Sequence, residues 1–80
     1  MEGIMMKQVL ELIAKALVDH PEAVSVNEVA GDQSIILELK VAEDDMGKVI
    51  GKQGRIAKAI RTVMRAAATR QSARVVVEID

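Results

Sequence analysis

The chain has 80 residues, no cysteine and no aromatic side chain, and its formal net charge is −1. This length allows one domain with one hydrophobic core, and the missing cysteines exclude a disulfide framework and a thiolate metal site. The missing aromatics exclude the stacking platforms with which many single-strand binders hold bases.

We expect residues 1–80 to form a single domain, in which residues 1–5 are a loose N-terminal extension and the natural start is either Met5 or Met6. No apolar run reaches the about 18 residues that a membrane span needs. No signal-peptide pattern opens the chain either. We therefore expect a cytoplasmic protein that does not associate with a membrane.

The charges divide unevenly along the chain. Residues 1–45 carry 10 acidic and 3 basic side chains, whereas residues 46–80 carry 2 acidic and 8 basic ones. This division indicates either an ordinary dipolar domain or a local basic footprint for a polyanion.

The first half of the chain predicts one helix followed by a hairpin. Apolar residues recur at helical spacing from Met6 to Val18, and Pro21 ends that helix. Alternating residues predict strands over 24–29 and 35–41, and the turn residues 31–33 between them make the pair antiparallel. The apolar helix positions are Met6, Val9, Leu10, Ile13, Ala14 and Leu17.

The second half predicts two helices and a last strand. Asp44 is the expected N-cap of a short helix that ends at Gly51, and a longer helix runs from Gly54 to about Thr69. The strand over 75–79 follows. Because two helices join the second and third strands, we expect these strands to be parallel neighbours. The expected core side chains of the long helix are Ile56, Ala57, Ile60, Val63, Met64 and Ala67.

The predicted fold class is therefore α+β, in the order α-β-β-α-α-β. A three-stranded mixed sheet would be packed on one face by three helices. Its other face would carry Glu38, Lys40, Arg74 and Glu78 to water.

The bend between the two later helices is the candidate functional element. Gly51 and Gly54 enclose Lys52 and Gln53, and glycine permits both unusual backbone angles and close approach of a ligand. The first amides of the second helix lack helical partners, and the helix dipole adds positive charge there, so this end suits a phosphate. Lys52 and Arg55 add full positive charges beside it.

The stretch VIGKQGRIAKAIR resembles the signature of the K-homology (KH) RNA-binding domain, in which a GxxG loop clamps a nucleic-acid backbone. The element order is that of the type II KH fold. From about Met6 to Ile79 the chain resembles the small single-domain bacterial KhpA family. The resemblance implies a cytoplasmic RNA chaperone that pairs with a larger multi-domain KH protein and takes part in control of cell elongation and envelope growth.

On this reading the chain binds single-stranded RNA between the bend and the edge of the sheet. Lys52 and Arg55 would contact phosphate, and Gln53 would donate hydrogen bonds to phosphate or sugar. The remaining expected RNA-binding residues are Gly47, Lys48 and Ile50 on the groove floor, Gly51 and Gly54 in the bend, and Lys58 and Arg61 on a basic rim. Arg65, Arg70 and Arg74 are taken as solvated charges.

Two other classes of function remain to be weighed. The same bend, with Gly47 and the alanines 66–68, would suit a homodimer or heterodimer seam, with RNA binding secondary. An enzyme is disfavoured, because the chain offers no nucleophile with a base, and GKQG lacks the spacing of a P-loop. His20 is the only histidine and has no ligand-spaced companion, so we expect no metal and no cofactor.

Overall fold

The computed structural model describes residues 6–69 and 74–79. In chain order they form helix α1 (Met6–Leu17), strands β1 (Ser25–Ala30) and β2 (Ser34–Lys40), helices α2 (Met46–Ile50) and α3 (Arg55–Ala68), and strand β3 (Arg74–Ile79). Short 3₁₀ turns η1 (Pro21–Ala23), η2 (Glu43–Asp45) and η3 (Lys52–Gly54) precede β1, α2 and α3. The predicted order α-β-β-α-α-β is confirmed.

The three strands form one mixed sheet in the order β1-β2-β3. Strands β1 and β2 are antiparallel, with Val26 opposite Leu39, and β2 and β3 are parallel, with Leu37 opposite Val77. Both pairings follow the prediction. The order leaves β3 as an edge strand, so one side of its backbone is free to face another element.

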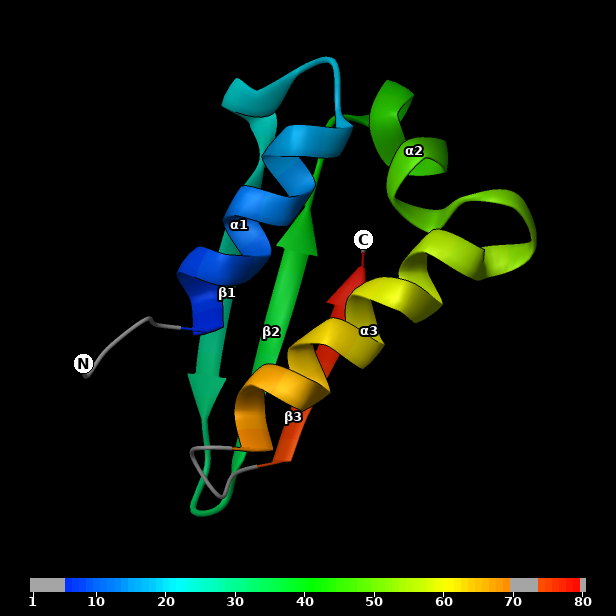
Figure 1. The fold of residues 1–80 in the computed structure, drawn as a ribbon. Helices are drawn as coiled ribbons and strands as arrows, with labels where there is room; N and C mark the ends of the chain where they lie inside the picture. The colour runs from blue at the N-terminus through cyan, green and yellow to red at the C-terminus, as the bar shows by residue number, and fades with distance from the viewer. Residues whose placement is uncertain (1–5, 70–73, 80) are drawn as a thin grey trace.

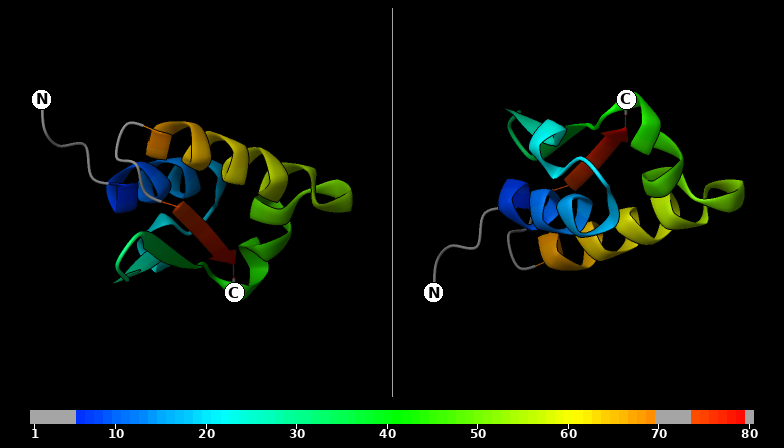
Figure 2. Two further views of the ribbon diagram at one scale, coloured as in Figure 1. Left: turned by 90° about the horizontal axis from the view of Figure 1, so that it is seen from below. Right: turned by 90° about the horizontal axis from the view of Figure 1, so that it is seen from above.

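The helices lie on one face of this sheet (Figures 1 and 2). Helices α1 and α3 pack against each other and against strands, while α2 packs against α1 and α3 at one end of the layer. The opposite face of the sheet carries no helix among the described residues (Figure 2). The bend between α2 and α3 stands out from the body of the domain at that end (Figure 1).

Aliphatic side chains alone fill the space between the helices and the sheet. Because the core has no aromatic residue, it is built from leucine, valine, isoleucine, methionine and alanine of every major element except α2. Its most deeply buried members are Leu10, Ala14, Leu37, Leu39 and Met64. The helical and alternating patterns of the sequence predicted all five positions.

Three local predictions are wrong. Asp44 does not cap α2, since the residue at the cap position is Asp45 and it makes no capping side-chain bond. Val63, predicted as core, is 48% exposed, because neither α1 nor the sheet covers that side of α3. Leu17, on the predicted apolar face of α1, is 36% exposed at the end of that helix. The long helix, predicted to run to about Thr69, ends at Ala68, and the expected extension 1–5 lies outside the described residues.

Candidate nucleic-acid interface

The bend is built from three residues in left-handed or glycine-like conformations. Gly51 ends α2 with φ 78° and ψ 173°, Gln53 follows at φ 58° and ψ 26°, and Gly54 caps α3 at φ 74° and ψ 15°. L-residues seldom adopt positive φ, so the chain reverses here only because two of the three positions are glycine. Long polar residues such as Gln53 visit this region at an energetic cost.

The two glycines are required for different reasons. A Cβ on Gly51 would lie 2.6 Å from Cγ1 of Ile56 and 2.9 Å from its backbone nitrogen, so the bend folds tightly onto the start of α3. A Cβ on Gly54 would meet nothing within 4 Å. Gly51 therefore closes the bend, whereas the backbone at Gly54 faces open space that another chain can approach.

Some of the backbone amides that were expected to face a phosphate already donate hydrogen bonds within the bend. The Gly54 N–H donates to the Gly51 carbonyl at 3.1 Å, and the Arg55 N–H donates to the Lys52 carbonyl. The prediction that all first-turn amides lack an internal partner is therefore wrong for Arg55. In the described part of the chain, the N–H groups of Lys52 and Gln53 have no backbone partner. These two, with no side-chain cap and no acid in the first turn of α3, leave the bend electropositive.

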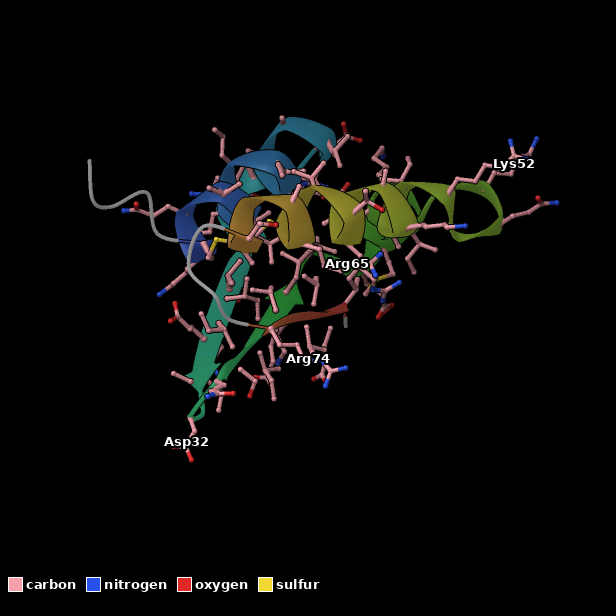
Figure 3. All side chains as sticks on the ribbon, turned by 60° about the horizontal axis from the view of Figure 1, so that its bottom comes forward. Asp32, Lys52, Arg65 and Arg74 are labelled. Carbon is pink, nitrogen blue, oxygen red and sulfur yellow. The ribbon has the colours of Figure 1, made fainter. Side chains whose placement is uncertain are left out.

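The cations of the bend reach outward. Lys52 projects from its tip, away from the body of the domain (Figure 3), and the side chain is exposed. The Arg55 guanidinium donates to the Gln53 side-chain oxygen at 3.5 Å, which directs both groups to the same side of the bend. The structure thus brings Lys52, Gln53 and Arg55 together around the glycines.

The residues of α2, the short helix before the bend, differ in how exposed they are. Gly47 is exposed, and a Cβ there would meet nothing within 4 Å, so no neighbouring helix explains this glycine. Ile50 is 37% exposed beside the bend, while Val49 is fully buried. Gly47 and Ile50 therefore present free surface, as a groove-lining role requires.

Lys48 turns away toward α1 and is engaged there. Its Nζ donates to Oδ2 of Asp19 at 2.8 Å and lies 3.6 Å from Oδ1 of Asp45. The hydrogen bond with Asp19 and the charge of that carboxylate hold the pKa of Lys48 above its usual value. Lys48 would have to leave this pairing to contact RNA.

The carboxylate of Asp45 connects the start of α2 to the end of α1. It is fully buried and accepts hydrogen bonds from the backbone N–H groups of Asp19, at 3.1 Å, and His20, at 2.9 Å. Burial by itself raises the pKa of Asp45, but these two hydrogen bonds and the electrostatic effect of the nearby His20 and Lys48 side chains outweigh it, so the pKa is lowered. No pattern in the sequence indicated this role, because acids before a helix normally act as solvated caps.

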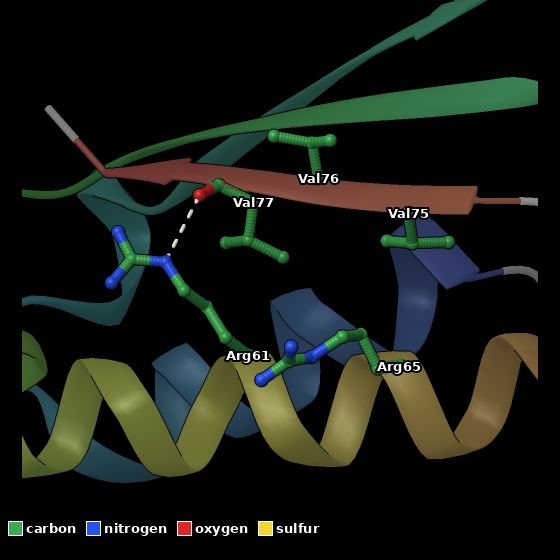
Figure 4. A pocket seen from close by; sticks show the side chains of 5 residues that line it. All are labelled: Arg61, Arg65, Val75, Val76 and Val77. Atoms are coloured by element: carbon green, nitrogen blue, oxygen red, sulfur yellow. Dashed lines mark hydrogen bonds between the residues drawn. The ribbon is translucent and has the colours of Figure 1, made fainter.

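A groove runs between α3 and the free edge of β3 (Figure 4). It has a volume of about 200 Å³ and is lined by Arg61, Arg65 and the valines 75–77. The Arg61 Nε donates to the Val77 carbonyl at 3.3 Å across it. Arg61 therefore lies where it was predicted, at the rim of a groove, whereas Lys58 is an exposed cation on the same helix.

The groove is also lined by Arg65, which was taken as a solvated charge, and by the three valines of β3, none of which the sequence analysis assigned to a site. The spacing carried a signal for Arg65, since residues four apart share one helix face and Arg61 was already assigned to the site. The predicted pairings already made β3 an edge strand, but no pattern in the sequence indicated which side chains of α3 would lie along it.

No cluster of histidine or acidic side chains suited to a metal ion occurs within residues 6–69 and 74–79. Over the same residues, no helix is both long enough and apolar enough to cross a membrane.

A mixed three-stranded sheet, three helices on one face and a GxxG bend between the last two helices define a KH domain of the type II arrangement. Residues 7–79 match the family model described as KhpA/KhpB, KH domain. The chain belongs to this family.

Curated relatives cover almost the same span. The chain is 74% identical over 74 residues to the RNA-binding protein KhpA of Clostridium acetobutylicum, a match covering 92% of this chain and 99% of the relative. The corresponding protein of Clostridium perfringens is 70% identical over the same shares. That of Aquifex aeolicus is 47% identical, with 92% and 94% covered. Because the family's curated members are named as RNA-binding proteins, the prediction that the chain is not an enzyme is confirmed.

Solved structures show the same fold. The chain aligns with the crystal structure of an Aquifex aeolicus Era variant bound to GDP·AlF4⁻ at a TM-score of 0.61 and 22% identity, covering 92% of this chain and 29% of that one. A structure of Era with MgGDPNP and nucleotides 1506–1542 of 16S ribosomal RNA gives the same TM-score and identity, with 28% of that chain covered. This chain thus spans under a third of the Era chains.

Proposed function

We propose that this protein binds single-stranded RNA, with the sugar–phosphate backbone held at the GxxG bend. The observation that carries the proposal is the bend itself: an open approach at Gly54, free N–H groups at Lys52 and Gln53 within the described residues, and outward cations at Lys52 and Arg55. The names of the curated relatives support RNA as the ligand.

The geometry supports separate binding places for the phosphates and for the bases of the RNA. Phosphates carry fixed charge, so they suit the bend, where amides and cations converge. Bases suit the groove between α3 and β3, whose walls are aliphatic and polar without aromatic stacking surfaces. Gly47, Ile50, Lys58 and Arg61 would border this path.

The double substitution Lys52→Asp with Gln53→Asp tests the proposal. Aspartate tolerates the left-handed conformation at position 53, and both side chains are exposed, so the fold should persist. Loss of one charge-assisted hydrogen bond, about 1.5–3 kcal/mol, should weaken RNA binding about 10- to 150-fold. Fluorescence anisotropy with a labelled single-stranded oligonucleotide measures this change.

A control with the same change in charge is available at exposed residues outside the bend. Gln33→Asp with Lys40→Asp alters exposed residues of the β1–β2 turn and the outer sheet face. It should leave the RNA affinity within about twofold, apart from long-range screening. Equal effects of the two double variants would show that net charge alone, and not the bend, governs binding.

From family membership we extend the proposal to a cytoplasmic RNA chaperone that acts with a larger, multi-domain KH protein in control of cell elongation and envelope growth. The family model covers both KhpA and KhpB, which supports a shared process. Co-purification of a tagged chain, followed by sequencing of bound RNA and mass spectrometry of bound proteins, tests both parts. Recovery of neither RNA nor a KH protein would contradict this extension.

A second candidate function, a protein-interaction module, is favoured by the exposed side of α3. Val63 is 48% exposed, and Ala59 and Ala66 lie exposed on the same side of the helix. The predicted alanine seam is narrower than expected, because Ala68 is in the core and Ala67 packs against it. If Lys52→Asp with Gln53→Asp abolishes association but leaves RNA affinity unchanged, the bend is a dimer seam. Val63→Asp tests whether this exposed side of α3 mediates association, which analytical ultracentrifugation measures.

A further inference from the structure

Two arginines face the groove between α3 and β3 from one side of the helix. Arg61 and Arg65 are four residues apart, and neither forms an ion pair with an acidic side chain in the described part of the chain. Like charges at this spacing destabilise a helix. Their position at the groove is therefore better explained by a ligand that offers acceptors than by the stability of the fold.

Arg61 is held in a fixed orientation. Its Nε donates to the Val77 carbonyl at 3.3 Å in a partly buried hydrogen bond, and its two terminal nitrogens point away from Arg65 (Figure 4). No hydrogen bond within residues 6–69 and 74–79 involves these terminal nitrogens. A guanidinium held at Nε presents its remaining donors as a rigid pair, and little side-chain freedom is lost when they bind.

The edge of β3 adds further donors to the same wall. The Arg74 N–H donates to the Gln33 carbonyl on the β2 side. Because backbone groups alternate in direction along a strand, those of Val75 and Val77 face the free edge. The Val77 carbonyl is already occupied by Arg61. This leaves the groove with more donors than acceptors.

We propose that Arg61, with Arg65 beside it, recognises a guanine base of the bound RNA. The inference rests on the proposed function and adds a base preference to it. Guanine presents two neighbouring acceptors, N7 and O6, which an arginine fork contacts with both terminal nitrogens. Adenine presents an acceptor next to a donor at the corresponding edge, so an arginine fork leaves one of its donors facing another donor.

A phosphate contact explains the geometry less well. Arg61 is seven residues beyond Gly54, about 10 Å along α3 from the bend where phosphates are expected. Its guanidinium also lies over the edge of β3, whose valines offer an apolar surface to a base and not to a phosphate. The arginine pair is thus in the part of the groove assigned to bases.

The test compares single-stranded uridine oligonucleotides in which one internal position is guanosine, adenosine or cytidine. Anisotropy titrations should show the guanosine oligonucleotide binding about 5- to 150-fold more tightly than the others, which is the discrimination of one bidentate arginine contact. Arg61→Lys keeps the charge but removes the fork, so it should abolish this preference. Arg74→Lys, on the outer face of the sheet, is the matched control and should retain the preference.

The outcomes separate this inference from the proposed function. Binding that depends on Lys52 and Gln53 but shows no guanosine preference, or a preference for another base, overturns the assignment of Arg61 and leaves RNA binding intact. A guanosine preference that survives Arg61→Lys also overturns it. Failure of every oligonucleotide to bind removes the proposed function and the inference together.

Discussion

Replacing Gly51 with alanine tests how the bend is held closed. At φ 78° and ψ 173° an alanine would be strained by about 1–3 kcal/mol. Its Cβ would lie 2.6 Å from Cγ1 and 2.9 Å from the backbone nitrogen of Ile56, and such overpacking costs about 1–3 kcal/mol more. The expected loss of unfolding free energy is therefore about 2–6 kcal/mol. A chain of this length has only about 4–12 kcal/mol in total.

Urea denaturation followed by circular dichroism measures this loss, and the melting temperature should fall by at least about 10 °C. Gly54→Ala is the matched control, because it introduces the same methyl group at a similar φ of 74° but into open space. It should cost only about 1–2 kcal/mol. If Gly51→Ala destabilises the protein no more than Gly54→Ala does, the contact with Ile56 does not close the bend.

Three further predictions address α2, the bend and the buried carboxylate. Gly47→Ala should raise the free energy of unfolding by about 0.5–1 kcal/mol, because it adds a methyl group to a helix in open space; destabilisation in urea would contradict this. Lys52→Ala should lower the slope of log affinity for RNA against log salt by about 0.7, the value for one phosphate on a single strand, and Lys40→Ala should not. The lowered pKa of Asp45 stabilises the fold above its unfolded pKa of about 3.9, and this stability is lost as the pH falls through the folded pKa. Asp45→Asn should therefore lower stability at pH 7 and flatten the acid side of the stability–pH curve. An acid side as steep as that of the wild type would contradict this origin of the effect.

Periodicity in the sequence was sufficient for the fold. The spacing of Leu10 and Ala14 and the alternation of Leu37 with Leu39 predicted which faces are buried, since apolar faces must meet in one core. The length of the connection between β2 and β3 predicted their parallel pairing. Each of these inferences uses a repeating local pattern or a length of chain.

Two of the wrong predictions concern contacts between distant segments. Asp45 is buried because the amides of Asp19 and His20, more than 20 residues earlier, point at it, and no local pattern records that approach. Val63 lies on the predicted apolar face of α3, yet it is 48% exposed because neither α1 nor the sheet covers that side of the helix. The width of a buried stripe depends on tertiary packing, which periodicity alone does not give.

In the candidate site, too, local features could be predicted from the sequence and tertiary contacts could not. The glycine spacing and the cations of the bend could be predicted because they are adjacent in sequence. The groove could not, because it depends on how α3 packs against the sheet and brings Arg61 and Arg65 beside the edge strand β3. Lys48 was assigned to this site from its proximity to the glycines, whereas its side chain pairs with Asp19.

The central claim, that the GxxG bend is where RNA binds, is tested most directly by NMR. Amide chemical shifts of ¹⁵N-labelled protein are followed while a single-stranded oligonucleotide is added. We predict the largest changes at residues 51–55, with smaller ones along the groove at Arg61, Arg65 and Val77. Changes concentrated on the outer sheet face, at Val29 and Ile36, with the bend unaffected, would contradict this claim.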